Sequence, residues 1–207
     1  SADVASAGLS SAGHPLLGAA TPLADSDGFL FTGRLSVSDH RWLADHTVFD
    51  TVLVPGTGLL ELVLAAGRTV GCTTVSDLTL AAPLVLPERG AVRVQLHVEP
   101  PDGQAHRSVA LYSRAEDAPE DGPWTAHATG TLSSPEDEAS PSADPRLQVW
   151  PPAGGEPLDL TDLYPRLAEQ GLGYGPAFQG LVEAWRVGDA VYGRVVLPAS
   201  VSGTAGD

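Results

Sequence analysis

The chain has 207 residues, of which 43% are hydrophobic and 18% are charged, so it can bury a core in one larger domain or two small ones. Its 11 basic and 26 acidic side chains give a formal net charge of −15, which argues against nucleic acid and anionic membranes as partners. The single cysteine, Cys72, excludes a disulfide within the chain and a cysteine-based zinc site, and no apolar stretch is long enough to span a bilayer. We therefore expect a cytoplasmic location.

The first part of the chain is predicted to begin with a linker and two strands. Residues 1–13 are small and polar, as in a flexible linker. Residues 28–37 alternate between apolar and polar, and residues 46–54 are rich in β-branched side chains, so both are predicted as strands. Pro55 and Gly56 end the second strand.

A buried helix and an antiparallel sheet are predicted to follow. Residues 57–71 are apolar on nearly every side, with Glu61 as the exception, which indicates a buried helix. Residues 91–99, 106–114 and 124–132 alternate with period two, which is typical of strands with one packed and one solvated face. The economical arrangement wraps this sheet around the helix.

A second unit is predicted after a linker. Residues 133–157 are rich in Ser, Pro and acidic side chains without periodicity, as expected of a linker. Residues 159–171 predict a helix, and residues 180–198 predict a hairpin with Gly188-Asp189 as its turn. One helix and one hairpin cannot close a core, so we expect the second unit, over 158–207, to be incomplete in this chain.

Several motifs occur in a specific order along the chain. "HPLLGA" stands at 14–19, and "WTAHATGTL" closes the first half. His46 and Pro55 fill the first and last places of a His-x3-Gly-x4-Pro pattern whose middle place holds Asp50, and Tyr-Gly-Pro-x-Phe runs from Tyr174 to Phe178. Over residues 14 to about 200, the chain resembles the dehydratase domains of modular polyketide synthases, which take part in antibiotic biosynthesis.

This resemblance implies an α+β double hotdog, in which each unit is an antiparallel sheet wrapped around a helix. The N-terminal hotdog would span 14–132, and the C-terminal hotdog would start at 158. The implied activity is removal of water from a β-hydroxyacyl thioester carried on the phosphopantetheine arm of an acyl carrier protein. It also implies a homodimer within a larger synthase, with neighbouring synthase domains as partners. The reaction requires no cofactor, and the sequence contains no metal-binding pattern.

The chemistry explains the residue types of the implied site. A neutral imidazole is a suitable base near pH 7 for the proton α to a thioester, so His46 is the candidate catalytic residue. Backbone N–H groups near Pro55 and Gly56, where the helix begins, could stabilise the negative charge on the carbonyl oxygen. Tyr174 and Phe178 either line the substrate pocket or only pack the second unit. The remaining histidines are interpreted as structural, with His97 and His127 on the polar side of their strands.

The chain departs from the family pattern in two ways. Asp50 replaces a glycine that would permit a positive φ, and we predict that it perturbs the fit of the substrate. In an extended strand Asp50 and His46 would be separated by about 13 Å, at about 3.3 Å per residue, which is too far for Asp50 to act as the acid. The family's catalytic aspartate belongs to a motif that is absent from this sequence. We therefore expect a truncated or nicked chain whose parent is active.

Two alternatives to dehydration stay open on the sequence alone. The same fold and base could shift a double bond or add water back, as an isomerase or hydratase would, and Asp50 could fit such a divergence. A dehydratase-like domain could also be non-catalytic and serve dimer contacts or carrier-protein docking. Turnover, and the position of the double bond in the product, distinguish the three.

Overall fold

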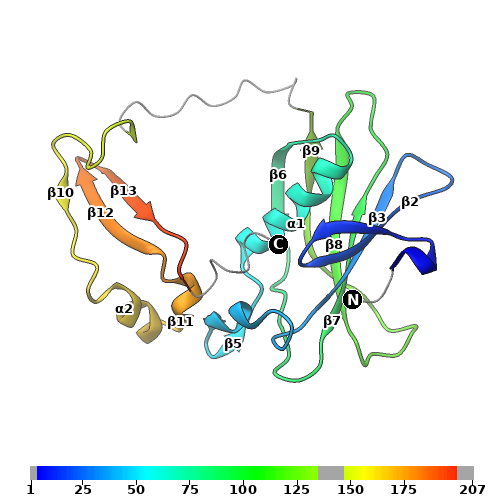
Figure 1. The fold of residues 1–207 in the computed structure, drawn as a ribbon, viewed down its shortest axis with the longest axis horizontal. Coiled ribbons are helices and arrows are strands. Elements are labelled where there is room, and N and C mark those ends of the chain that lie inside the picture. Colours follow the sequence, from blue (N-terminus) through cyan, green and yellow to red (C-terminus); the bar gives the residue numbers. More distant parts are fainter. Residues whose placement is uncertain (1–3, 135–146, 200–207) are drawn as a thin grey trace. The chain divides into compact units, whose positions relative to one another are not determined.

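The computed structural model describes residues 4–134 and 147–199, which form two compact units. Unit 1 comprises Ser1–His40 and Leu53–Ala139, and unit 2 comprises Arg41–Val52 and Ser140–Asp207 (Figure 1). The segment 41–52 therefore belongs by its contacts to the C-terminal unit, whereas the sequence predicted it within the N-terminal hotdog. Within the described residues no helix has the length and apolarity to cross a membrane.

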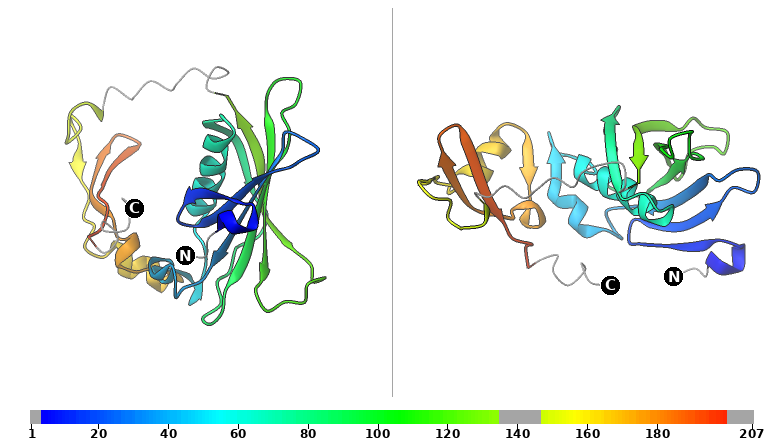
Figure 2. Two further views of the ribbon diagram at one scale, coloured as in Figure 1. Left: turned by 45° about the vertical axis from the view of Figure 1, so that its right-hand side comes forward. Right: turned by 90° about the horizontal axis from the view of Figure 1, so that it is seen from above.

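Unit 1 is a seven-stranded antiparallel sheet with helix α1 (Gly56–Thr69) against one face (Figure 2). The predicted helix and four of the predicted strands, at 28–37, 91–99, 106–114 and 124–132, are confirmed. Three further strands, over 10–14, 17–22 and 74–80, have no counterpart in the sequence prediction. In spatial order the strands are β1 (Ser10–His14), β2 (Leu17–Pro22), β3 (Phe29–Leu35), β7 (Val92–Val98), β8 (Arg107–Ala115), β9 (Thr125–Ser133) and β6 (Thr74–Leu80).

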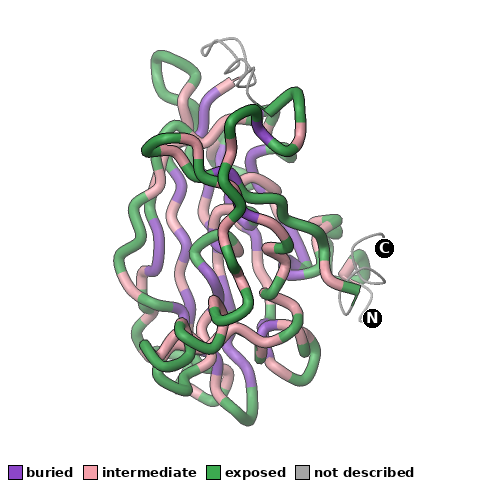
Figure 3. Tube along the Cα trace, turned by 90° about the vertical axis from the view of Figure 1, so that its left-hand side faces the viewer, coloured by how far each residue is buried: buried purple, intermediate pink, exposed green. Residues whose placement is uncertain are grey.

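The core of unit 1 lies between the sheet and α1. Buried stretches of the chain alternate with exposed and half-buried ones (Figure 3). The alternation is most regular in β7, where every second residue is buried, as period-two patterning requires. Fully buried side chains come from β3, α1, β7, β8 and β9. They include Phe31, Leu35, Leu62, Val63, Val94, Leu96, Leu111 and Leu132.

Helix α1 buries one face rather than its whole circumference. Its buried residues are Leu59, Leu62, Val63, Ala66 and Gly67. Glu61 and Arg68 are exposed and form an ion pair of 2.8 Å. The prediction of a helix buried on all sides is therefore wrong within unit 1, because the helix is amphipathic there.

The start of the chain also differs from its prediction as a flexible linker over 1–13. A 3-10 helix, η1, covers Val4–Ala7, and β1 pairs with β2 through Ser10↔Ala20 and Ser11↔Ala19. The small polar residues that suggested a linker instead form an edge strand with mostly exposed or half-buried side chains.

His127 is buried rather than on a polar face. Only 3% of its surface is exposed. The β8–β9 register shifts between Leu111 and Tyr112, opposite His127, and this bulge turns its side chain inward. The ring lies 2.7 Å from Ser113 Oγ through Nε2 and 3.1 Å from the Ala82 carbonyl oxygen through Nδ1, so both nitrogens are satisfied.

Over its described residues, 41–52 and 147–199, unit 2 contains two small antiparallel sheets and one short α-helix. The predicted hairpin is confirmed, with Gly188 at φ 59° in its turn, and the predicted helix is present but shorter than 159–171. Of the predicted linker, residues 135–146 lie outside the described residues. The sheets are β10-β12-β13 and β11-β4-β5, built from β4 (His46–Val48), β5 (Thr51–Val52), β10 (Glu156–Pro157), β11 (Leu172–Tyr174), β12 (Leu181–Val187) and β13 (Ala190–Val195); the helices are η2 (Arg41–Asp45), α2 (Leu163–Glu169) and η4 (Pro176–Phe178).

The predicted strand over 46–54 is broken by a turn. Phe49 and Asp50 adopt φ values of 46° and 60°, so β4 and β5 form a tight hairpin in which Val48 pairs with Thr51. His46 and Asp50 therefore do not lie four residues apart along one extended strand, as the sequence predicted. Asp50 stands where the family motif has glycine, which is compatible with a positive φ, but Phe49 carries no such signal, so the β-branched residues around it predicted one continuous strand.

Candidate active site around His46

His46 is the first residue of β4 and directly follows η2. In the antiparallel pairing of β4 with β11, His46 lies opposite Tyr174 and Thr47 lies opposite Gly173. Directly opposite residues of such a pair project to the same face of the sheet. The pairing therefore brings the predicted base next to the Tyr-Gly-Pro-x-Phe motif.

Two aromatic rings pack against the imidazole of His46. Its centroid lies 5.5 Å from that of Tyr174, in a stacked arrangement, and 5.2 Å from that of Phe178. Trp42 extends the cluster, 5.9 Å from Phe178. These distances are in the range preferred by interacting rings. The four side chains are half-buried, so the imidazole has apolar walls and keeps some exposure.

The backbone around this cluster is held by Asp45. The Gly175 N–H donates to the Asp45 carbonyl oxygen at 2.7 Å, and the Ala177 N–H donates to its carboxylate Oδ2 at 2.8 Å. On the same turn, Gln179 Nε2 donates to the Tyr174 carbonyl oxygen at 2.6 Å. Asp45 was not among the residues predicted for the site, and its only signal in the sequence is an acidic residue directly before the candidate base.

Asp50 sits at the tip of the β4–β5 hairpin, with an exposed side chain. Its φ of 60° explains why the motif carries glycine at this place, since glycine adopts this conformation without strain and Asp tolerates it better than most residues. The neighbouring Phe49 is 76% exposed, and its N–H donates to the Gly171 carbonyl oxygen at 2.7 Å.

Pro55 and Gly56 belong to unit 1, at the beginning of α1. Pro55 is buried in an extended conformation, and its carbonyl oxygen accepts the N–H groups of Gly58 and Leu59. The Val54 N–H donates to the Leu84 carbonyl oxygen, which fixes the chain where it enters the helix. The structure thus gathers His46, Tyr174 and Phe178 within unit 2 and places Pro55 and Gly56 in the other unit.

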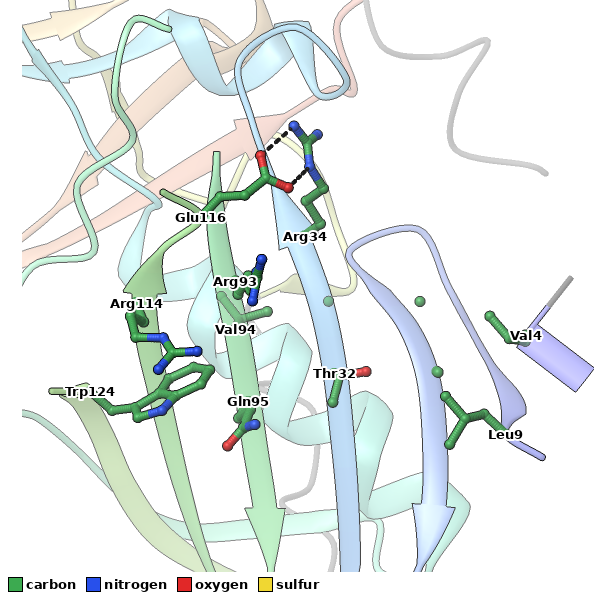
Figure 4. Close-up of a pocket in the computed structure, with 13 residues that line it drawn as sticks. Val4, Leu9, Thr32, Arg34, Arg93, Val94, Gln95, Arg114, Glu116 and Trp124 are labelled. Carbon is green, nitrogen blue, oxygen red and sulfur yellow. Dashed lines mark hydrogen bonds and ion pairs between the residues drawn. The ribbon is translucent and has the colours of Figure 1, made fainter. Parts of the chain in front are cut away.

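A hollow of about 460 Å³ lies on the solvent-facing side of unit 1 and contains none of the predicted site residues (Figure 4). Arg34 at its edge is neutralised by Glu116 at 2.7 Å, and Arg114 lies over the Trp124 ring at 4.8 Å. Because none of the predicted site residues lines this hollow, we assign it no part in the chemistry. Over residues 4–134 and 147–199, no cluster of three His, Cys, Asp or Glu side chains could hold a metal ion.

Comparisons with known proteins define the class. Residues 14–114 match the family model "Polyketide synthase dehydratase domain", and residues 142–207 match "Polyketide synthase dehydratase N-terminal domain". The solved dehydratase domain from the terminal module of the rifamycin polyketide synthase is 45% identical, with a TM-score of 0.92 over 99% of this chain and 74% of that one. The chain therefore belongs to the dehydratase domains of polyketide synthases, and its fold is the double hotdog.

Two further relatives belong to the same class. The pikromycin polyketide synthase component PikAII of Streptomyces venezuelae is 56% identical over 204 residues, and the match covers 99% of this chain but only 5% of that protein. The CurK dehydratase, solved as an inactive mutant with a histidine replaced by phenylalanine, is 28% identical with a TM-score of 0.77, over 93% of this chain and 67% of that one. The chain spans a small fraction of its curated relatives, which are large synthases.

Proposed function

We propose that this chain belongs to a β-hydroxyacyl thioester dehydratase in which His46 removes the proton α to the thioester carbonyl. The observation that carries the proposal is the position of the imidazole, which packs against the rings of both Tyr174 and Phe178 in a domain of the polyketide synthase dehydratase family. The inactive histidine-to-phenylalanine mutant of the CurK dehydratase supports an essential histidine in this family.

The proposed reaction moves one proton at each end of the bond that becomes double. His46 takes the α proton as a neutral base, and an acid returns a proton to the leaving β-hydroxyl. Negative charge collects on the thioester oxygen as the α proton leaves, and preorganised backbone N–H groups are the usual donors that stabilise such a charge. An inactive aspartate-to-asparagine mutant of the CurK dehydratase supports a carboxyl as that acid.

The remaining predicted residues would bind the acyl chain. Tyr174 and Phe178 would form an apolar wall beside the imidazole, and Asp50 would shape the entrance from the hairpin tip. We propose that the substrate arrives on the phosphopantetheine arm of an acyl carrier protein, that the enzyme needs no cofactor of its own, and that it works as a cytoplasmic homodimer beside other synthase domains.

The test offers a β-hydroxyacyl thioester to a longer form of the chain, extended to the length of the rifamycin dehydratase domain of which it covers 74%, and follows loss of one water by mass spectrometry. Turnover to the α,β-unsaturated product that disappears in His46→Ala supports the proposal. A product with the double bond elsewhere indicates an isomerase instead. Absence of turnover from every thioester offered would indicate a non-catalytic domain.

A further inference from the structure

Asp45 binds the turn between Tyr174 and Phe178 at two points. Its carbonyl oxygen accepts the Gly175 N–H at 2.7 Å, and its carboxylate accepts the Ala177 N–H at 2.8 Å. A hydrogen bond to an ionised carboxylate is roughly twice as strong as one between neutral groups. The bound N–H lies within η4, so the carboxylate anchors this short helix.

The anchored turn carries the two aromatic residues that contact His46. Tyr174 precedes the turn and Phe178 ends it, and their rings lie 5.5 Å and 5.2 Å from the imidazole. Asp45 and His46 are consecutive residues. A single peptide unit therefore links Asp45, which binds the turn, to the imidazole of His46, which contacts the two aromatic rings of that turn.

A second observation comes from Gly175. Its φ of −78° and ψ of −176° are accessible to any residue, so the backbone conformation does not require glycine here. A Cβ on Gly175 would instead lie 2.5 Å from Cγ and Oδ1 of Asp45. Glycine is needed because the Asp45 side chain occupies the adjacent space, which shows how closely the carboxyl packs on the turn.

We infer that Asp45 is a positioning residue for the dehydration: it holds Tyr174 and Phe178 against His46 and so fixes the orientation of the imidazole. This inference rests on the proposed function only in taking His46 as the base. Asp45 exchanges no proton with the substrate in this scheme, and its effect reaches the reaction through the aromatic pair. Misplacing a reacting group by about 1 Å can cost about a hundredfold in rate.

The experiment compares Asp45→Ala and Asp45→Asn in the longer form of the chain, with Asp189→Asn as a control at an exposed turn of the same unit. Asp45→Ala should lower kcat about tenfold or more with little change in KM. Asp45→Asn keeps an oxygen that can accept the Ala177 N–H, so it should recover most of the activity. If the unmodified chain is inactive as well, the proposed function fails and not this inference.

A spectroscopic readout makes the test independent of turnover. Ring currents from Tyr174 and Phe178 should displace the proton resonances of the His46 ring, and Asp45→Ala should move them toward random-coil values while methyl resonances of unit 1 stay in place. Gly175→Ala should produce the same change with Asp45 still present, and should add little in the Asp45→Ala background. Unchanged kcat and unchanged His46 resonances in both single variants would overturn the inference.

Discussion

His46 and Tyr174 face each other across the β4–β11 pair, and their ring centroids lie 5.5 Å apart although the two residues are far apart in the sequence. The short strands that create this pairing contain only three residues each. The geometry of the proposed base therefore depends on a small amount of sheet, supplemented by Phe178 and by the two bonds to Asp45.

Replacing Tyr174 tests whether its ring or its hydroxyl matters. Tyr174→Phe keeps the stacked ring and should leave kcat and thermal stability close to those of the unmodified chain. Tyr174→Ala removes the ring pair and should lower the free energy of unfolding by about 1 kcal/mol or more, together with kcat. Steady-state kinetics and chemical denaturation measure the two effects. Equal losses in both variants would assign the role to the hydroxyl instead.

Asp50 offers a test of backbone conformation at the hairpin tip. At φ 60° a β-branched residue is strained, so Asp50→Val should lower the free energy of unfolding by about 1–2 kcal/mol. Asp50→Gly should change it by less than about 1 kcal/mol, because relief of strain is offset by a more flexible unfolded chain. Urea unfolding provides the measurement, and Asp189→Val is the control at a turn residue without positive φ.

The activity of Asp50→Gly separates two roles of this residue. If the side chain perturbs the fit of the substrate, as predicted from the sequence, replacing it changes KM to an extent that depends on the length of the acyl chain. Unchanged kcat and KM across short and long thioesters would limit Asp50 to its place in the turn.

The elements that the sequence predicted well are those with a local signal. Period two in 91–99 and the apolar run of 57–71 specify their own conformation, so β7 and α1 appear as expected. The site depended on distant contacts. Tyr174 and Phe178 entered only through the family resemblance, and Asp45 was missed because its partners are Gly175 and Ala177, which no local pattern links to it.

His127 provides a test of buried polar structure in unit 1. Its ring bridges Ser113 and the Ala82 carbonyl oxygen, and the segment after Ala82 binds Val54 just before α1. His127→Ala should lower the free energy of unfolding by about 2–4 kcal/mol, since it leaves a cavity and unpaired polar groups. Ser113→Ala, which leaves the bond to Ala82, should cost about 1 kcal/mol. A loss below that of Ser113→Ala would contradict this role.

The pH dependence of stability should report on His14. Burial lowers the pKa of its imidazole, and Glu61, whose Oε1 lies 3.9 Å from Nε2, acts in the opposite direction and only partly compensates. Because the unfolded chain retains the ordinary pKa of about 6.5, it binds more protons than the folded chain as the pH falls below that value. The free energy of unfolding should therefore decrease as the pH falls from about 6.5 to the lower folded pKa, and this contribution should then level off.

His14→Gln should make the decrease shallower in urea titrations between pH 7 and about pH 5, whereas His106→Gln serves as a control elsewhere in unit 1. An identical slope in His14→Gln and in the unmodified chain would show that the buried imidazole does not control this part of the stability profile.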